Sequence, residues 1–263
     1  MSNFQTIKLK SSPGGVTSIL INRPEKHNAF TAQVIDELAD AFETVRTSNC
    51  RMLLLRGAGK SFSAGADLNW MKAAAHYSKS ENQADALKLA QMLHRLADLP
   101  MMTVACVQGA CMGGGVGLAA ACDVVIAHKD AMFRFSEVRL GLTPGTISPF
   151  VIRAIGPRWA NALFVSGESF NANYAEKIGL VHYPVADETE MEDMIEHLGK
   201  LAFHTAPQAV AKAKQLVREV TGQPIDDELM HVTAKHIAER RASDEGIEGL
   251  SAFLEKRKPK WAE

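Results

Sequence analysis

The chain has 263 residues, of which 46% are hydrophobic and 22% charged, and its net charge is −1. This composition is that of a globular protein with a sizeable core, and the near-zero charge argues against binding to nucleic acid or anionic membranes through bulk charge. The uncharged residues 101–122 are long enough to cross a bilayer. Five glycines and Gln108 interrupt them, so we expect a buried strand and a buried helix, and no membrane span.

The cysteines and the N-terminus bear on the cellular compartment. Cys50, Cys106, Cys111 and Cys122 stand in apolar surroundings without a CxxC pair, which predicts buried, reduced thiols in a cytoplasmic protein. Residues 1–10 lack the apolar segment of a signal peptide. The nine histidines show no HExxH or other paired spacing, so we expect no metal site.

The first half of the chain predicts strands that alternate with helices. A turn at residues 11–15 separates two β-rich runs, as in a hairpin, and Thr31 is placed to cap the helix that follows it. Residues 73–82 are polar and irregular, and they form either a mobile lid or a plain surface loop. In chain order, we expect strands at 5–9 and 16–21, a helix at 31–46, a strand at 52–56, a helix at 84–99, and strands at 103–107, 124–127 and 132–135.

After residue 158 the pattern is helical. Ser243, followed by two acidic residues, opens the last helix. The alternation in the first part gives an α/β fold class, and we expect a core over residues 1–200 and a helical C-terminal region over 201–263. The other expected helices lie at 159–165, 173–178, 190–204, 207–220 and 225–241.

Two small-residue turns each follow an apolar strand and precede a helix. In residues 61–68, Asp67 falls in the first helical turn, where an acidic side chain suits the helix dipole. In residues 107–118, three consecutive glycines at 113–115 let a ligand approach backbone N–H groups at a helix N-terminus. Either turn alone is compatible with tight packing. Together they could aim one N–H each at a single oxygen, as enzymes do to stabilise an acyl oxyanion.

A carboxylate follows the second turn. Glu137 comes after Phe133, Phe135 and Ser136 in a largely apolar stretch. Desolvation there would raise the pKa of Glu137 towards neutrality and suit it to proton transfer. The alternative is an exposed glutamate at the end of a strand.

These features resemble the enoyl-CoA hydratase/isomerase (crotonase) family. The resemblance implies an α/β fold in which ββα units wind into a spiral, a helical C-terminal domain, and assembly as a homotrimer or homohexamer. It implies an acyl-CoA thioester as the substrate and no further cofactor. The matching segments follow the family's order over nearly the whole chain and comprise residues 22–30, 62–68, 107–123, 133–144, 175–181 and 243–258.

The resemblance also implies roles for residues at matching positions. The backbone N–H groups of Ala66 and Gly114 would hold the thioester oxygen, and Glu137 would transfer protons. Basic side chains in the loop before the first turn would face the phosphates of CoA. The residues expected to bind the substrate are Arg23, Lys26, Ala29, Ala64, Asp67, Leu68, Asn69, Gly113 and Ser136.

One position departs from the family's hydratases, which often carry a second glutamate in the glycine-rich helix. That position is Gly117 here. Three interpretations remain: a hydratase that uses Glu137 alone, a Δ3,Δ2-enoyl-CoA isomerase, which needs only one base, and a non-catalytic acyl-CoA binder. RNA binding, which some family members are thought to combine with catalysis, is opposed by the near-neutral charge.

Local sequence favours the hydratase. Residues 65–71, 136–142 and 147–151 resemble the bacterial branch that hydrates 3-methylglutaconyl-CoA in leucine degradation, or isohexenylglutaconyl-CoA. That branch also tends to have a small residue at the position of Gly117. We therefore expect a glutaconyl-type substrate whose own carboxylate fills the space beside Gly117, with Arg134 or Arg139 to hold it.

Overall fold

Two sheets form the core of the protein. The computed structural model describes residues 4–262. The main sheet has six strands in the order β1-β2-β3-β4-β6-β9, all parallel to their neighbours except in the β1–β2 hairpin, and the smaller sheet has the order β5-β7-β8. The strands are β1 (Ile7–Ser11), β2 (Val16–Ile21), β3 (Met52–Gly57), β4 (Met102–Val107), β5 (Ala110–Met112), β6 (Val124–His128), β7 (Met132–Arg134), β8 (Ser169–Asn171) and β9 (Tyr183–Val185).

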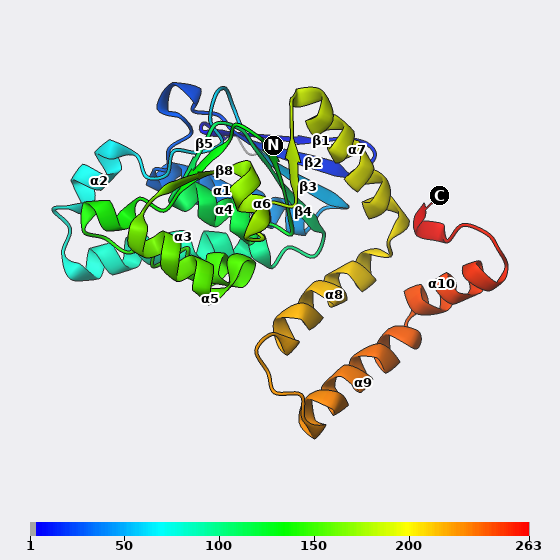
Figure 1. Ribbon diagram of the computed structural model, residues 1–263. Helices are drawn as coiled ribbons and strands as arrows, with labels where there is room; N and C mark the ends of the chain where they lie inside the picture. The colour runs from blue at the N-terminus through cyan, green and yellow to red at the C-terminus, as the bar shows by residue number, and fades with distance from the viewer. Residues whose placement is uncertain (1–3, 263) are drawn as a thin grey trace.

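Helices cover both faces of the main sheet (Figure 1). They are α1 (Ala32–Arg46), α2 (Leu68–Ala74), α3 (Lys79–Ala97), α4 (Gly114–Ala121), α5 (Ser148–Ser166), α6 (Ala172–Lys177), α7 (Glu188–His204), α8 (Pro207–Val220), α9 (Asp227–Arg241) and α10 (Asp244–Leu254), with 3-10 turns η1 (Pro24–Lys26), η2 (Glu137–Leu140) and η3 (Lys260–Ala262). Side chains alternate across a strand. Leu53 and Leu55 of β3 therefore join the core formed with α1, α3 and α4, whereas Met52 and Leu54 join the core formed with α7.

Units of two strands and a helix recur along the chain. They are β1–β2–α1, β4–β5–α4 and β6–β7–α5. In the unit that begins with β3, Ser63 makes only a single bridge, to Cys111, in place of a second strand. This is the winding of ββα units that the family resemblance implies.

The segment predicted to be irregular is largely helical. Helix α2 ends at Ala74 and α3 begins at Lys79 rather than at residue 84. The helix starts early because Ser78 and Glu81 form a capping box, in which each side chain accepts a hydrogen bond from the other's backbone N–H. The prediction for residues 73–82 is therefore wrong for most of its length.

Other differences arise where the local signal is weak or interrupted. Helix α5 begins at Ser148 rather than at residue 159, and Gly156, with φ of 73°, bends it before Pro157. Strands β5, β8 and β9 were not predicted, because their three residues show no alternation by themselves. Strand β7 is as short but lies within the predicted strand at 132–135. The prediction for α1 is confirmed, and the Thr31 hydroxyl accepts its capping hydrogen bond from the Val34 N–H (3.3 Å).

The last three helices form an arm, and its first helix, α8, is joined to the body by an ion pair between Lys214 and Asp123 (2.6 Å). Figure 1 shows α8, α9 and α10 projecting from the sheets and the chain end returning toward α7. The returning segment is tied to the end of α7, because the Trp261 Nε1–H donates to the His204 carbonyl (3.3 Å). Among residues 4–262, no helix is both long and apolar enough to cross a membrane. The division of the chain near residue 200 stays a prediction.

Candidate active site

The two small-residue turns lie against each other because the first runs beside β5. The Met112 N–H donates to the Ser63 carbonyl (2.9 Å), and the Ser63 N–H donates to the Ala110 carbonyl (3.1 Å). Gly65 has φ of 87°, and a Cβ at this position would lie 3.0 Å from the Met112 carbonyl oxygen. Only glycine allows so close an approach in that conformation. The N-terminus of α4 therefore lies beside the turn that carries Ala66.

The peptide that carries the Ala66 N–H is fixed in position, while the N–H itself makes no hydrogen bond among the described residues. The Phe30 N–H donates to the Gly65 carbonyl (2.7 Å), and the Asp67 N–H donates to the Phe30 carbonyl (2.8 Å). These two bonds bracket Ala66 in a short parallel bridge. Within residues 4–262 the Ala66 N–H has no acceptor, so it is available to a ligand.

The Gly114 amide is free for a different reason. Gly114 is the first residue of α4, and N–H groups in the first turn of a helix have no intrahelical acceptor. The preceding Gly113, with φ of 48°, donates its own N–H to the Arg134 carbonyl (2.9 Å). No described residue accepts from Gly114, and the helix dipole adds partial positive charge at this end.

Glu137 is the carboxylate of this region that lacks a charged partner among the described residues. Its Oε1 lies 3.0 Å from where a Cβ on Gly113 would stand, so the absence of a side chain at Gly113 leaves room for the carboxylate next to Gly114. Its Oε2 is buried and has no hydrogen-bond partner in the described chain. Burial raises the pKa of Glu137 above its usual value. A carboxylate in such surroundings is suited to take up and return a proton.

The space beside Gly117 is occupied. A Cβ on Gly117 would overlap the Ile147 side chain, with the Ile147 Cβ at 2.9 Å, and would lie 3.5 Å from Leu93 Cδ1. Ile147, just before α5, thus fills the volume that a side chain at 117 would need. The expectation that a substrate carboxylate sits beside Gly117 is therefore wrong.

The loop before α1 is tied to the first turn by an ion pair. Arg23 and Asp67 lie 3.1 Å apart, with side chains only 17% and 9% exposed. Arg23 also donates to the Ala29 carbonyl, and Asp67 caps α2 by accepting from the Asn69 N–H (2.9 Å). Burial acts to raise the pKa of Asp67, but the bonds from Asn69 and Arg23 outweigh it and lower that pKa. The Arg23 guanidinium thus already has hydrogen-bond partners within the protein.

The remaining residues expected to bind the substrate lie around the first turn or, in the case of Ser136, directly before Glu137. The Ala64 N–H donates to the His27 carbonyl (2.9 Å). Lys26 is exposed on η1, Leu68 is 74% exposed at the start of α2, and Ser136 is half-buried before η2. The structure brings all the expected site residues into one region, and their contact with substrate stays a prediction.

Two residues of this region were not expected to belong to the site. Phe30 lies in a motif that carries the family resemblance, but its apolar side chain predicts only a core position. Ile147 lies ten residues after Glu137, and its contact with Gly117 depends on how α5 packs on α4. No signal in a single sequence shows either contact.

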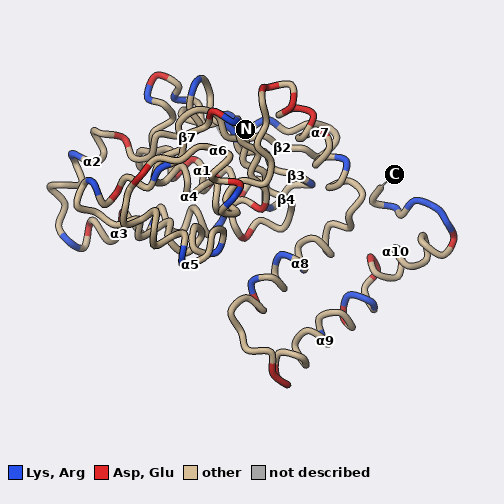
Figure 2. The backbone as a smooth tube through the Cα atoms, in the orientation of Figure 1, with Lys and Arg blue, Asp and Glu red and all other residues tan. Residues whose placement is uncertain are grey.

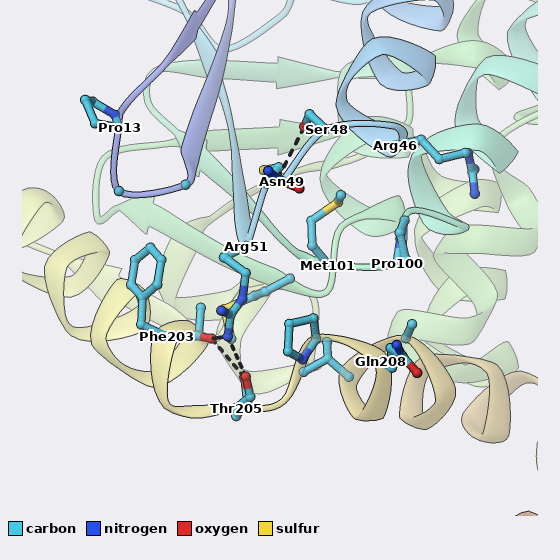
Figure 3. Close-up of a pocket in the computed structure, with 18 residues that line it drawn as sticks. Pro13, Arg46, Ser48, Asn49, Arg51, Pro100, Met101, Phe203, Thr205 and Gln208 are labelled. Carbon is cyan, nitrogen blue, oxygen red and sulfur yellow. Dashed lines mark hydrogen bonds between the residues drawn. The ribbon is translucent and has the colours of Figure 1, made fainter. Parts of the chain in front are cut away.

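A separate cavity of about 610 Å³ lies at the opposite edge of the main sheet (Figure 3). Arg51 and Met101 line it where β3 and β4 begin, whereas Ala66 and Gly114 follow the carboxyl ends of these strands. Ligands of parallel sheets bind at the carboxyl ends. Arg51 donates to backbone carbonyls that include that of Thr205, so it holds the junction between α7 and α8.

No cluster of three or more His, Cys, Asp or Glu side chains able to hold a metal ion occurs in the described part of the chain. The site offers two backbone N–H groups and, besides the ion-paired Asp67, the Glu137 carboxylate. These groups suit an acyl oxygen and a proton rather than a metal ion.

Comparisons with known proteins agree with this geometry. The family model described as enoyl-CoA hydratase/isomerase matches residues 11–263. A crystal structure of an enoyl-CoA hydratase from Shewanella pealeana is 38% identical, with 98% of this chain and 97% of that chain covered and a TM-score of 0.94. A Legionella pneumophila protein assigned to the enoyl-CoA hydratase/isomerase (crotonase) class is 43% identical, with 98% and 100% covered and a TM-score of 0.90.

A relative with a named substrate is the 2,3-dehydroadipyl-CoA hydratase of Escherichia coli K12. It is 31% identical over 252 residues, which cover 93% of this chain and 94% of that protein. These relatives support enoyl-CoA hydration at the level of the family. With the family model matched along nearly the full length and the fold shared, the chain belongs to the enoyl-CoA hydratase/isomerase (crotonase) family.

Proposed function

We propose that the protein adds water across the 2,3 double bond of a 2-enoyl-CoA, with Glu137 as the only acid/base. The carboxylate takes a proton from water as the water oxygen bonds to C3. The π electrons of the C2–C3 bond move toward the thioester oxygen, which the N–H groups of Ala66 and Gly114 stabilise. The carboxylic acid of Glu137 then returns the proton to C2.

The observation that carries this proposal is the pairing of two free amides with one unpartnered carboxylate. Glu137 Oε1 approaches Gly113, the neighbour of Gly114, and Oε2 is buried without a partner among the described residues. Ile147 occupies the position from which a second glutamate would act. The chemistry therefore falls to one carboxylate, and a non-catalytic acyl-CoA binder would not need it.

A second candidate is a Δ3,Δ2-enoyl-CoA isomerase. In that reaction Glu137 removes a proton from C2 and returns it to C4, and no water is added. The apolar contact of Ile147 and Leu93 with Gly117 favours this candidate, because those side chains offer no hydrogen bond that would hold a catalytic water. The same two amides would stabilise the dienolate.

We further propose a glutaconyl-type acyl group that ends in a carboxylate. The resemblance of residues 136–142 to the glutaconyl-CoA branch supports it, and the E. coli relative is named for an acyl group that also ends in a carboxylate. Arg134 is engaged, since its Nε–H donates to the Gly167 carbonyl (2.8 Å). Arg139 is exposed two residues after Glu137, and we propose that it holds the substrate carboxylate.

The experiment that separates these reactions is turnover in H₂¹⁸O. The substrates are 3-methylglutaconyl-CoA and a 3-enoyl-CoA, each with wild-type protein and with Glu137→Gln as the control. We expect ¹⁸O in the glutaconyl product formed by the wild type and none with Glu137→Gln. A double-bond shift without uptake of oxygen would establish the isomerase instead, and no turnover of either substrate would contradict both.

We also propose a cytoplasmic homotrimer or homohexamer whose subunits meet through the C-terminal arm. Apolar side chains on that arm are largely exposed, with Phe253 at 80% and Leu254 at 77%. All four cysteines are free thiols, which supports a reducing compartment. Lys/Arg and Asp/Glu are interspersed along the chain (Figure 2), which favours an acyl-CoA over RNA as the partner.

A further inference from the structure

We propose that Phe30 is the positioning residue that fixes the two oxyanion amides relative to each other. This inference rests on the proposed role of Ala66 and Gly114 as hydrogen-bond donors. In the proposed mechanism Phe30 touches neither the substrate nor the reacting atoms. It acts because its backbone holds one amide and its side chain holds the other.

The backbone of Phe30 sets the position of the first amide. The Phe30 N–H donates to the Gly65 carbonyl (2.7 Å) and the Phe30 carbonyl accepts from the Asp67 N–H (2.8 Å). Both peptide units that flank Ala66 are thereby tied to one residue. A shift of Phe30 along the chain or away from the turn would move the Ala66 N–H with it.

The ring of Phe30 sets the position of the second amide. A Cβ on Gly114 would stand 2.8 Å from Cε2 and 3.0 Å from Cδ2 of the ring. The ring therefore lies directly against the Gly114 backbone, at the point where α4 begins. Phe30 is only 1% exposed and belongs to the main hydrophobic core, so close packing leaves the ring little freedom to move.

The segment that carries Phe30 has its own anchors. The Asn28 side-chain amide donates to the carbonyls of Ala58 (2.8 Å) and Ser61 (2.7 Å), and the Ser63 hydroxyl donates to the Asn28 carbonyl (2.9 Å). These bonds do not involve the ring. Removing the ring should therefore release Gly114 while the loop and the Ala66 bracket persist.

The geometry makes Phe30 a spacer between two donors that must meet one oxygen. Oxyanion donors act at hydrogen-bond distances from the developing charge, and a misplacement of about 1 Å at a reacting centre costs on the order of 100-fold in rate. Loss of the ring should thus lower kcat more than it changes KM. A purely structural core residue would lower stability without this split.

The first test compares Phe30→Leu with Phe42→Leu. Phe42 lies in α1, is fully buried and belongs to the same core, so its variant controls for the loss of a buried ring. We expect both variants to lose similar thermal stability. Phe30→Leu should lose about 10- to 100-fold in kcat with KM little changed, whereas Phe42→Leu should keep its kcat. An equal kcat for the two variants would overturn the proposal.

A second variant approaches the same contact from the other side. Gly114→Ala places a methyl group against the Phe30 ring and should lower kcat in the wild-type background. In the Phe30→Leu background the smaller side chain leaves room for the methyl group, so Gly114→Ala should lower kcat by a smaller factor. In the Phe42→Leu background Gly114→Ala should lower kcat by the same factor as in the wild type. If Gly114→Ala lowers kcat by the same factor in both backgrounds, the contact between the Phe30 ring and Gly114 does not control the second amide. If Phe30→Leu does not fold, Phe30→Met, which also lacks the ring but fills more of its volume, takes its place in both comparisons.

A readout without turnover separates this inference from the proposed reaction. Butyryl-CoA carrying ¹³C at the thioester carbonyl binds without reacting, and its infrared stretch should shift to lower frequency when the two amides polarise the carbonyl. Phe30→Leu should reduce that shift and Phe42→Leu should not. No shift in the wild type would refute the amide roles themselves, whereas a full shift in Phe30→Leu would refute only the role of Phe30.

Discussion

The Glu137 carboxylate lies in surroundings that disfavour its charged form. Its Oε2 is buried without a hydrogen-bond partner among the described residues, and its Oε1 faces a glycine. Groups held in such surroundings lower stability and are kept for chemistry. The raised pKa of Glu137 has a direct consequence for the dependence of stability on pH.

We predict that Glu137→Gln is more stable than the wild type near neutral pH. Burial raises the folded-state pKa of Glu137 above 4.5, so the folded protein favours the protonated acid. As pH rises from 4.5 through the raised pKa, the wild type loses stability that the uncharged glutamine keeps. Thermal unfolding of both proteins across this pH range measures the difference, which should narrow as the pH falls toward 4.5. A variant less stable than the wild type near pH 7 would show that the carboxylate has a stabilising partner.

We predict that Gly117→Glu alone damages the fold instead of adding a catalytic group. The new Cβ would overlap Ile147 and stand 2.9 Å from the Ile147 Cβ, and overpacking of this kind costs about 1–3 kcal/mol. The double variant Gly117→Glu/Ile147→Gly should recover thermal stability and gain turnover of crotonyl-CoA. Ile147→Gly alone is the control and should not gain it. A stable, fully active Gly117→Glu single variant would contradict the contact.

For individual residues of the site, the sequence predicts the residue types better than the contacts they make. Glycines that allow a backbone approach and a glutamate in an apolar stretch are recognisable, and the structure places Ala66, Gly114 and Glu137 in one region. The expectation that a substrate carboxylate fills an empty space beside Gly117 was wrong. Glycine at a helix position says only that no side chain is present, and Ile147 reaches it from another element.

At the scale of elements, the strand–turn–helix units carry the site. Long or strongly capped elements such as α1 and α8 could be predicted from apolar spacing and end signals. Strands β5, β8 and β9 could not, because three residues give no period of their own. Strand β7 is equally short and could be predicted because the apolar alternation continues beyond it to Phe135. Yet β5 is what brings the turn with Ala66 beside α4. The site therefore depends on tertiary pairing that the sequence does not show.

We predict that Gly65→Ala lowers both stability and kcat. The residue has φ of 87° and its new Cβ would lie 3.0 Å from the Met112 carbonyl oxygen, so the turn must move and Ala66 with it. The left-handed conformation alone costs about 1–2 kcal/mol for a residue other than glycine. Urea unfolding and steady-state turnover measure the two effects.

The matched control for this change is Gly222→Ala. Gly222 has φ of 77°, with no atom of the described chain within 4 Å of its added Cβ. It should lose similar stability and keep its kcat. Equal activity of the Gly65→Ala and Gly222→Ala proteins would show that the first turn does not control the amide.

At the scale of the whole molecule, the arm formed by α8, α9 and α10 is the feature that a single chain does not explain. It projects from the body (Figure 1) and exposes Ile225 at 89%, Phe253 at 80% and Leu254 at 77%. Exposed apolar surface of this kind marks an interaction site. The helices of the arm are predictable from sequence, but their path away from the body is not, because amphipathic spacing does not say which partner covers a face.

We predict that the wild-type protein sediments as a trimer or hexamer and that Phe253→Asp shifts it to smaller species. A carboxylate at the centre of an apolar contact would be desolvated without a partner. Phe253→Leu is the control, since it keeps an apolar side chain and should keep the assembly. Analytical ultracentrifugation distinguishes these states. A wild-type monomer, or a Phe253→Asp protein with the wild-type assembly, would exclude this face of the arm as the interface.

In the proposed mechanism Glu137 alone moves the protons while backbone amides hold the thioester. The decisive experiment is turnover of the 2-enoyl-CoA substrate by Glu137→Gln, together with the Kd of a saturated acyl-CoA. We expect a loss in kcat of about 100- to 10,000-fold with the Kd unchanged, because glutamine keeps the shape of the site and cannot exchange a proton. Wild-type turnover by the Glu137→Gln protein would show that another group moves the protons.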